Sequence, residues 1–178
     1  KLAGALCAAV LAFPVHAADL SNQVINIGSD TTYPPHEFIE DGVVKGFDVD
    51  VVAEICARIK CQPNWITTAW DGIFGKLQAG EFDMVVSGVT ITEERDKIVD
   101  FSEPYIIVQQ GVLMRVADQG KTIDDFKSGA MRLASQTGTT NATLGEELVG
   151  RDNLALFDAF NNAVVALQNG DVDGVIID

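Results

Sequence analysis

Short apolar runs alternate with amphipathic stretches along most of the chain, starting at Val24. The apolar runs are rich in β-branched residues and predict strands at 24–28, 64–67, 84–87, 111–114, 132–135, 154–157 and 174–177. The stretches between them predict helices at 48–59, 72–78, 93–98, 141–148 and 160–168. Because strands and helices alternate with short turns, we expect an α/β protein with parallel sheets and right-handed crossovers.

A ten-residue pattern occurs twice, at 77–86 and again at 167–176. Each copy combines a helix end, a glycine C-cap, an acidic turn and a buried strand. A second similarity links 30–33 with 138–141, each directly after a predicted strand. Such turns also arise by convergence, but two similarities in the same order favour two similar lobes.

The domain organisation follows from this repeat. We predict a first lobe over 18–108 and a second over 109–178, with 105–111 as an extended hinge segment between them. The second copy of the repeat stops at Asp178, at the end of its strand. In a two-lobe protein of this order we expect further chain that returns to the first lobe, so the C-terminal part is expected to be missing.

The first seventeen residues form an apolar run with one cation, Lys1, and no acidic residue. The run ends in Val15-His16-Ala17, which is typical of a signal-peptide cleavage site. A membrane helix is the alternative, but the apolar stretch is short for a bilayer and Pro14 interrupts it. We therefore predict that 1–17 is a cleaved signal peptide and that the protein works in the periplasm or outside the cell.

The chain is acidic, with 26 acidic against 12 basic residues and a formal net charge of -14. Removing 1–17 takes away one lysine and no acid, which changes the charge from -14 to -15. A negatively charged surface argues against nucleic acid and anionic membranes as partners. Since no second apolar run reaches the length of a membrane span, we expect the exported chain to be soluble. We also expect a monomer.

Two cysteines, Cys56 and Cys61, remain after residue 17. In an oxidising compartment an even pair this close predicts one disulfide. A zinc site needs more ligands than the single remaining histidine, His36, can complete. We predict no metal and no cofactor.

Polar residues follow several predicted strands at their carboxyl ends, where open parallel sheets bind ligands. These candidates are Asp30, Tyr33, Ser87, Gly88, Thr90, Arg95, Gln136, Thr139, Thr140 and Asp178. Several also have a simpler interpretation. Thr92 and Arg95 fit a capped surface helix, Thr139 and Thr140 could merely cap the next helix, and Tyr33 and Trp70 could be core residues. The alternative is that Arg95 and the threonines bind a carboxylate.

Several motifs in this order resemble one known family. They are DTTYPP at 30–35, GFDVD at 46–50, WDGI at 70–73, TITEER at 90–95, DFS at 100–102, GTT at 138–140 and the strand 171–178. Together they resemble the periplasmic polar-amino-acid-binding proteins of ABC importers, whose relatives bind lysine, arginine, ornithine, histidine or glutamine. The resemblance covers about 24–178. His36 departs from the pattern, because relatives usually carry an apolar aromatic residue there.

The resemblance implies a type II binding-protein fold whose two lobes close on one amino acid. It suggests Arg95 for the α-carboxylate, helped by N–H groups at Thr90 and Thr140. Asp178 would pair with the α-ammonium, alongside the Ser87 hydroxyl or the Gly88 carbonyl. Tyr33 and Trp70 would flank the ligand side chain. Asp30 would meet its polar end, and Gln136 stands where the family varies with the ligand.

Asp30 favours a basic or glutamine-like ligand over an acidic one, because a carboxylate would repel it. We expect the permease subunits of an ABC importer as partners. Two alternatives use the same fold: a ligand-sensing domain of a membrane receptor, and an exported dehydratase of the cyclohexadienyl or arogenate type. The sequence offers no nucleophile elbow, triad spacing or metal set, so we predict no catalytic residue.

Overall fold

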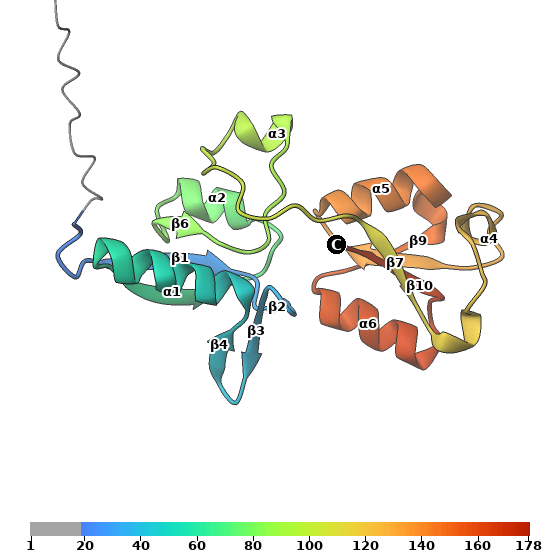
Figure 1. Cartoon of the computed structure of the whole chain (residues 1–178). Helices are drawn as coiled ribbons and strands as arrows, with labels where there is room; N and C mark the ends of the chain where they lie inside the picture. Colours follow the sequence, from blue (N-terminus) through green and yellow to red (C-terminus); the bar gives the residue numbers. More distant parts are fainter. Residues whose placement is uncertain (1–18) are drawn as a thin grey trace, which may run out of the picture.

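A computed structural model describes residues 19–178. The predicted signal peptide lies outside these residues. Helices and strands fall into two groups, linked by residues 100–110, which form neither helix nor strand (Figure 1). We call the elements before this segment the first lobe and those after it the second lobe.

The first lobe is built on a three-stranded parallel sheet in the order β5-β1-β6. Its strands are β1 (Val24–Ser29), β5 (Gln62–Thr67) and β6 (Met84–Val85). Helices α1 (Phe47–Ile59) and α2 (Ile73–Gln78) connect them, as the alternating pattern predicts. β6 is shorter than expected. The short helix α3 (Glu93–Asp96) follows, and the Thr92 hydroxyl caps it by accepting from the Arg95 N–H, as predicted.

A small antiparallel sheet projects from the first lobe and was not predicted. It consists of β2 (Thr32–Tyr33), β3 (Glu37–Glu40) and β4 (Val43–Lys45) in that order. These strands are too short to show an alternating pattern. Asp41 and Gly42, both with positive φ, make the turn between β3 and β4, and an Asp-Gly pair is a known hairpin signal.

The second lobe contains a four-stranded sheet in the order β7-β10-β8-β9. β8 (Leu133–Gln136), β9 (Leu154–Phe157) and β10 (Gly174–Ile177) are parallel, as predicted. β7 (Gly111–Met114) instead pairs antiparallel with β10, which differs from the expected all-parallel sheet. The reason is that β7 follows an extended segment and not a crossover helix, so nothing imposes the parallel direction.

Helices cover the second sheet (Figure 1). They are α4 (Ile123–Lys127), α5 (Thr140–Val149) and α6 (Phe160–Asn169), with short 3₁₀ turns η1 (Val116–Asp118) and η2 (Arg151–Asn153). Phe126, Leu133 and Ile176 are almost fully buried between helices and sheet. The sequence pattern gave no strong signal for α4, which has only five residues.

The two copies of the ten-residue repeat, 77–86 and 167–176, contain strands β6 and β10, which take equivalent positions in the two sheets. β6 lies beside β1 in the first lobe, and β10 lies beside β8 in the second, both parallel. Gly170 ends α6 as a left-handed C-cap, as predicted, whereas Ala79 is the C-cap of α2 and Gly80 follows it. The two copies therefore occupy corresponding positions.

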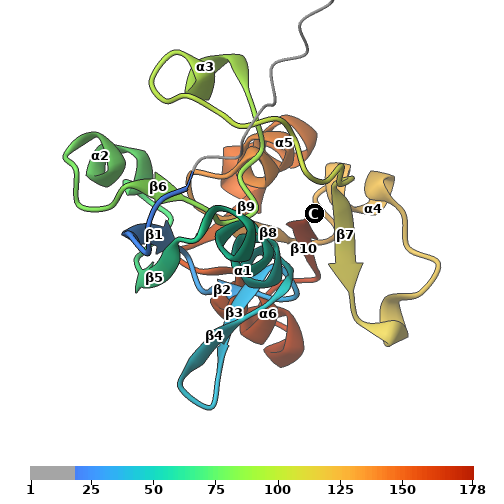
Figure 2. The ribbon, with the colours of Figure 1, turned by 60° about the vertical axis from the view of Figure 1, so that its left-hand side comes forward.

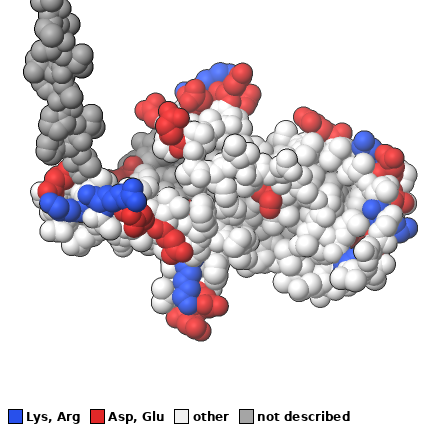
Figure 3. All heavy atoms as spheres, viewed as in Figure 1, with Lys and Arg blue, Asp and Glu red and all other residues white. Residues whose placement is uncertain are grey.

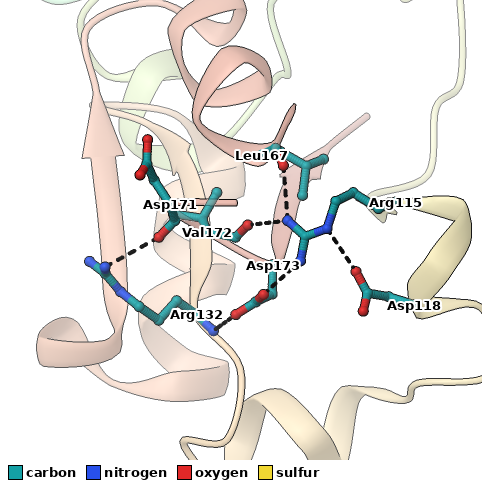
Figure 4. Close-up of polar contacts among 7 residues, drawn as sticks. All are labelled: Arg115, Asp118, Arg132, Leu167, Asp171, Val172 and Asp173. Atoms are coloured by element: carbon teal, nitrogen blue, oxygen red, sulfur yellow. Dashed lines mark hydrogen bonds and ion pairs between the residues drawn. The ribbon is translucent and has the colours of Figure 1, made fainter. Parts of the chain in front are cut away.

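An arginine-centred cluster holds the second copy of the repeat in place (Figure 4). Arg115 donates to the carbonyl oxygens of Leu167 and Val172 at 2.9 and 2.7 Å. It also forms ion pairs with Asp173 at 2.7 Å and with Asp118 at 3.0 Å. The side chain thus ties the end of α6 and the start of β10 to the segment after β7.

The surface and the cysteines match the sequence analysis. Cys56 and Cys61 form a disulfide at the end of α1. In the view of Figure 3, charged side chains lie over α1, α3, the β3–β4 hairpin and the outer end of the second lobe, while the middle is largely uncharged. No helix formed by residues 19–178 has the length and apolar character needed to cross a membrane.

Candidate functional site

The carboxyl ends of β1, β6, β8 and β10 meet where the two lobes adjoin. α6 of the second lobe lies beside β2 of the first lobe in both views (Figures 1 and 2). A cavity with about 340 Å³ of empty space lies at this junction. Its lining includes all eleven residues selected from the sequence: Asp30, Tyr33, Trp70, Ser87, Gly88, Thr90, Arg95, Gln136, Thr139, Thr140 and Asp178.

Asp30 and Gln136 close one end of the cavity. The Gln136 amide donates to Asp30 Oδ2 at 2.5 Å and to the carbonyl oxygen of Asp158 at 2.9 Å. The other Asp30 oxygen accepts from the Thr32 hydroxyl at 2.8 Å. Because both amide hydrogens of Gln136 are used, this end offers mainly oxygen acceptors to a ligand.

Tyr33 lies in the wall between the lobes. Its ring stacks on the rings of Phe160 in α6 and of His36, with distances between ring centres of 4.9 and 5.2 Å. Its hydroxyl donates to Asp178 Oδ2 at 3.0 Å. Burial and the negative charge of Asp178 raise the pKa of Tyr33 above its ordinary value. Tyr33 is therefore both a core residue and a lining residue, and His36 takes the packing role of the apolar aromatic that the resemblance led us to expect.

Arg95 faces the cavity from the first lobe. Its guanidinium donates to the Thr90 carbonyl oxygen at 2.8 Å and lies 5.1 Å from the centre of the Trp70 ring. None of the ion pairs formed within residues 19–178 involves Arg95. Burial lowers its pKa and the charge of Asp178 opposes that shift, so the two charges act on each other across the cavity.

Trp70 lies beside Arg95 and connects the two lobes through a hydrogen bond. Its indole N–H donates to the Gly138 carbonyl oxygen at 2.9 Å, and Phe74 packs against it edge-on at 5.7 Å. The ring thus contributes an apolar face next to the guanidinium of Arg95. Such contacts favour a cation over the face of an aromatic ring.

The start of α5 contributes Thr139 and Thr140. The Thr139 hydroxyl accepts from the Ala142 N–H at 3.0 Å and donates to the Gln136 carbonyl oxygen at 2.7 Å, so it caps the helix. α5 spans ten residues, and its first N–H groups point towards the cavity end of the helix. The capping interpretation is thus correct for Thr139, and it is compatible with a place in the cavity lining.

Ser87 and Gly88 follow β6. Gly88 has φ of +52°, and a Cβ there would lie 3.2 Å from the Tyr33 ring, so the position requires glycine. Its N–H donates to Asp48 Oδ2 at 2.8 Å. The Ser87 hydroxyl donates to Glu37 Oε1 at 2.7 Å and accepts from the Asp30 N–H at 2.9 Å.

The sequence analysis missed three lining residues, Glu37, Asn141 and Phe160. Phe160 follows the carboxyl end of β9, so the rule applied to the other strands points to it. Asn141 lies in the first turn of α5 and donates to Asp178 Oδ2 at 3.3 Å. Glu37 lies in the unpredicted sheet, and no local pattern singled it out.

The cavity therefore combines a guanidinium from the first lobe, that of Arg95, with a carboxylate from the second lobe, that of Asp178. Arg95 forms no ion pair within residues 19–178. Five hydrogen bonds cross between the lobes beside the cavity, donated by the side chains of Tyr33, Trp70, Gln136 and Arg95 and by the N–H of Asp178. Such a site suits a small molecule that carries both charges, because each charge requires an opposite partner once water is excluded.

A second, larger hollow with about 1830 Å³ of empty space lies next to β6 and the connecting segment. Its lining is mostly apolar and includes Ile55, Met84 and Ile106. Its lining contains carboxylates but no lysine or arginine that could pair with the carboxylate of a zwitterion, so the smaller polar cavity is the candidate site.

The fold and site define a two-lobed α/β binding protein with a polar cavity between its lobes. Residues 25–175 match the family model of bacterial extracellular solute-binding proteins, family 3. The chain belongs to this family, as the motifs indicated.

Individual relatives agree with this assignment. The chain is 32% identical to the ABC transporter arginine-binding protein 1 of Escherichia coli K12, over 86% of this chain and 63% of the relative. The solved arginine-, lysine-, histidine-binding protein ArtJ of Geobacillus stearothermophilus is 32% identical with a TM-score of 0.80, covering 87% of this chain and 67% of that one. An ancestral amino acid-binding protein, described as a precursor of cyclohexadienyl dehydratase, is 33% identical with a TM-score of 0.80, covering 87% and 70%.

The chain spans about three fifths of the length of the curated relatives it matches, 63% of one and 59% of another. These relatives are named as binding proteins and not as enzymes.

Proposed function

We propose that this protein is the extracytoplasmic solute-binding component of an amino-acid ABC importer, and that it captures a free polar or basic L-amino acid by closure of its two lobes. The observation that carries the proposal is that Arg95 and Asp178, which come from different lobes, line the same cavity. A zwitterion needs both partners, so the closed state is complete only around the ligand.

We infer the following roles for the residues selected from the sequence. Arg95 binds the α-carboxylate, helped by N–H groups at Thr90 and at the start of α5, where Thr139 and Thr140 lie. Asp178 binds the α-ammonium together with the Ser87 hydroxyl or the Gly88 carbonyl. Tyr33 and Trp70 flank the side chain.

The ligand side chain ends at Asp30 and Gln136. The two residues present a carboxylate and an amide oxygen, which accept hydrogen bonds from a cation or an amide. We infer a basic ligand, arginine, lysine, histidine or ornithine, in preference to glutamine, because only a cation neutralises the buried Asp30. The relatives named for arginine and histidine support this preference.

The location and partners are inferred by analogy with the family. We infer that the protein works in the periplasm as a monomer and delivers its ligand to the permease subunits of the importer. The disulfide between Cys56 and Cys61 suits an oxidising compartment.

A thermal-shift panel of the twenty amino acids tests the proposal, because a ligand that binds only the folded state raises the melting temperature. We expect the largest shift with arginine, lysine or histidine. Agmatine, which is arginine without its α-carboxylate, is the matched control and should give little shift, since Arg95 then has no partner. No shift with any amino acid, or equal shifts with arginine and agmatine, would show that the proposal is wrong.

A further inference from the structure

Three buried titratable side chains, His36, Glu37 and Asp48, lie together beside the cavity. Each places one potential ligand atom within 4.8 Å of the other two. Glu37 and Asp48 are 0% exposed. They come from β3 and from the first turn of α1, and the sequence pattern assigned neither a role.

Each carboxyl group has one oxygen with a partner and one without. Glu37 Oε1 accepts from the Ser87 hydroxyl at 2.7 Å, and Asp48 Oδ2 accepts from the Gly88 N–H at 2.8 Å. Glu37 Oε2 and Asp48 Oδ1 have no hydrogen-bond partner among the described residues. His36 Nδ1 is 3.8 Å from Asp48 Oδ1, too far for a hydrogen bond. Two ionised carboxylates placed like this would be costly, because both are buried and no lysine or arginine within residues 19–178 forms an ion pair with either of them.

We propose that Glu37 and Asp48 share one proton between their two unpartnered oxygens, and that the neutral Glu37 is a positioning residue that fixes the Ser87 hydroxyl for amino-acid binding. The part about ligand binding rests on the proposed function. The proton satisfies both orphan oxygens at once, because a protonated carboxyl group donates one hydrogen bond that the neighbouring carboxylate accepts.

The electrostatic surroundings agree with this arrangement. Burial raises the pKa of Glu37 to about 10; the Ser87 hydrogen bond opposes the shift, and the Asp48 and Asp30 carboxyl groups add to it. The other titratable groups that face the pair are His36, Tyr33 and Tyr105. None of these three supplies a permanent positive charge.

The Glu37 side chain determines how Ser87 faces the cavity. Its hydroxyl hydrogen points to Glu37, and one lone pair accepts from the Asp30 N–H. A hydroxyl oxygen has a second lone pair, and Ser87 lines the cavity. Glu37 therefore makes Ser87 an acceptor, which matches an ammonium group and not a carboxylate.

The first experiment tests the proton in the absence of ligand and compares the wild type with Glu37→Gln. Glutamine keeps an acceptor for Ser87 and a donor for Asp48 but cannot ionise. We expect a carboxylic-acid C=O band in the infrared spectrum of the wild type at pH 8, and its loss in Glu37→Gln. Glu40→Gln, an exposed position on the same strand, is the control and should keep the band.

The pH dependence of unfolding gives a second readout. A group whose folded pKa is raised loses stabilisation as pH rises towards that value, because the native state binds the extra proton. Between about pH 6 and 9, the unfolding equilibrium constant of the wild type should increase relative to Glu37→Gln by up to tenfold per pH unit. A ratio that does not change with pH, together with no infrared band, overturns the proposal. Loss of stability on dialysis against EDTA would show that the cluster holds a metal ion, and overturns it as well.

The positioning role is tested with L-arginine and L-glutamine by calorimetry at pH 7. Glu37→Gln should bind the better of the two within about twofold of the wild type, whereas Glu37→Ala should bind it about three- to tenfold more weakly. Equal affinities for the two variants contradict the positioning role. If the wild type binds neither amino acid, the proposed function is in doubt, but the infrared and unfolding results still decide whether the proton is shared.

Discussion

The Gln136 side chain donates to the Asp30 carboxylate at 2.5 Å across the junction of the two lobes, although 106 positions separate the two residues. This hydrogen bond closes the end of the cavity where a ligand side chain would lie. It also leaves the buried Asp30 with hydrogen-bond donors but no cation within residues 19–178. A cationic ligand would supply the missing charge.

Asp30→Asn tests this relationship. The substitution keeps the shape and removes the charge, so arginine should bind about ten- to a hundredfold more weakly, as a hydrogen bond to a charged group is worth about 1.5–3 kcal/mol. Glutamine should lose less than about threefold. Calorimetric titration measures both, and Asp41→Asn in the exposed β3–β4 turn is the control. Equal losses for the two ligands would show that Asp30 does not meet the side-chain end.

Arg95→Lys tests the site of the α-carboxylate. Lysine keeps the positive charge but loses the planar, two-pronged geometry and the stacking on Trp70. We expect amino-acid affinity to fall about ten- to a hundredfold with little change in melting temperature. Arg58→Lys on the exposed face of α1 provides the control. Unchanged affinity would remove Arg95 from the binding site.

Much of the fold was predictable because hydrophobic periodicity is a local signal. Each of the seven predicted strands and five predicted helices has a counterpart, and most of their ends agree within one residue. The β2–β4 sheet and α4 were missed because elements of two to five residues contain too few positions to show a period. The Asp41-Gly42 turn was the one local signal that could have revealed the hairpin.

The candidate site was predictable for a different reason. The carboxyl ends of parallel strands meet at one edge, so residues such as Ser87 and Asp178 could be collected without knowledge of their distances. The pairs that cross between the lobes, such as Asp30 with Gln136, depend on how two separate sheets adjoin. Periodicity within one lobe contains no information about that contact, and the same holds for Glu37.

Asp173→Asn probes the cluster around Arg115 (Figure 4). The N–H of Arg132 and the guanidinium of Arg115 hold the pKa of Asp173 below its ordinary value. Stabilisation by such a group is present above the unfolded pKa of about 3.9 and is lost as pH falls through the folded pKa. We expect the variant to lose about 1–3 kcal/mol of unfolding free energy at pH 7.

Urea unfolding at pH 7 and at about pH 3 checks this expectation. The difference between wild type and variant should shrink at the lower pH, because protonation removes the charge from the wild-type carboxyl group as well. Asp171→Asn, at an exposed neighbouring position, should change stability little at either pH. A difference that stays constant with pH would mean that the charge of Asp173 is not what stabilises the cluster.

Gly28→Ala tests how tightly the first lobe is packed beneath the cavity. A Cβ at Gly28, in the central strand β1, would lie 2.6 Å from the ring of Phe82, which is 4% exposed. The ring is enclosed by Trp70 and Ile73, so it cannot move aside without disturbing the wall that holds Trp70. Overpacking of this kind costs about 1–3 kcal/mol, and we expect a loss of that size in chemical unfolding.

Gly75→Ala is the matched control, because nothing lies within 4 Å of a Cβ built at Gly75 in α2. Alanine favours a helix over glycine by about 1 kcal/mol, so this variant should be as stable as the wild type or more so. The two substitutions add the same methyl group to the same lobe and should have opposite effects. If Gly28→Ala is tolerated as well as Gly75→Ala, then Phe82 has room to shift and the wall around Trp70 is looser than the contacts indicate.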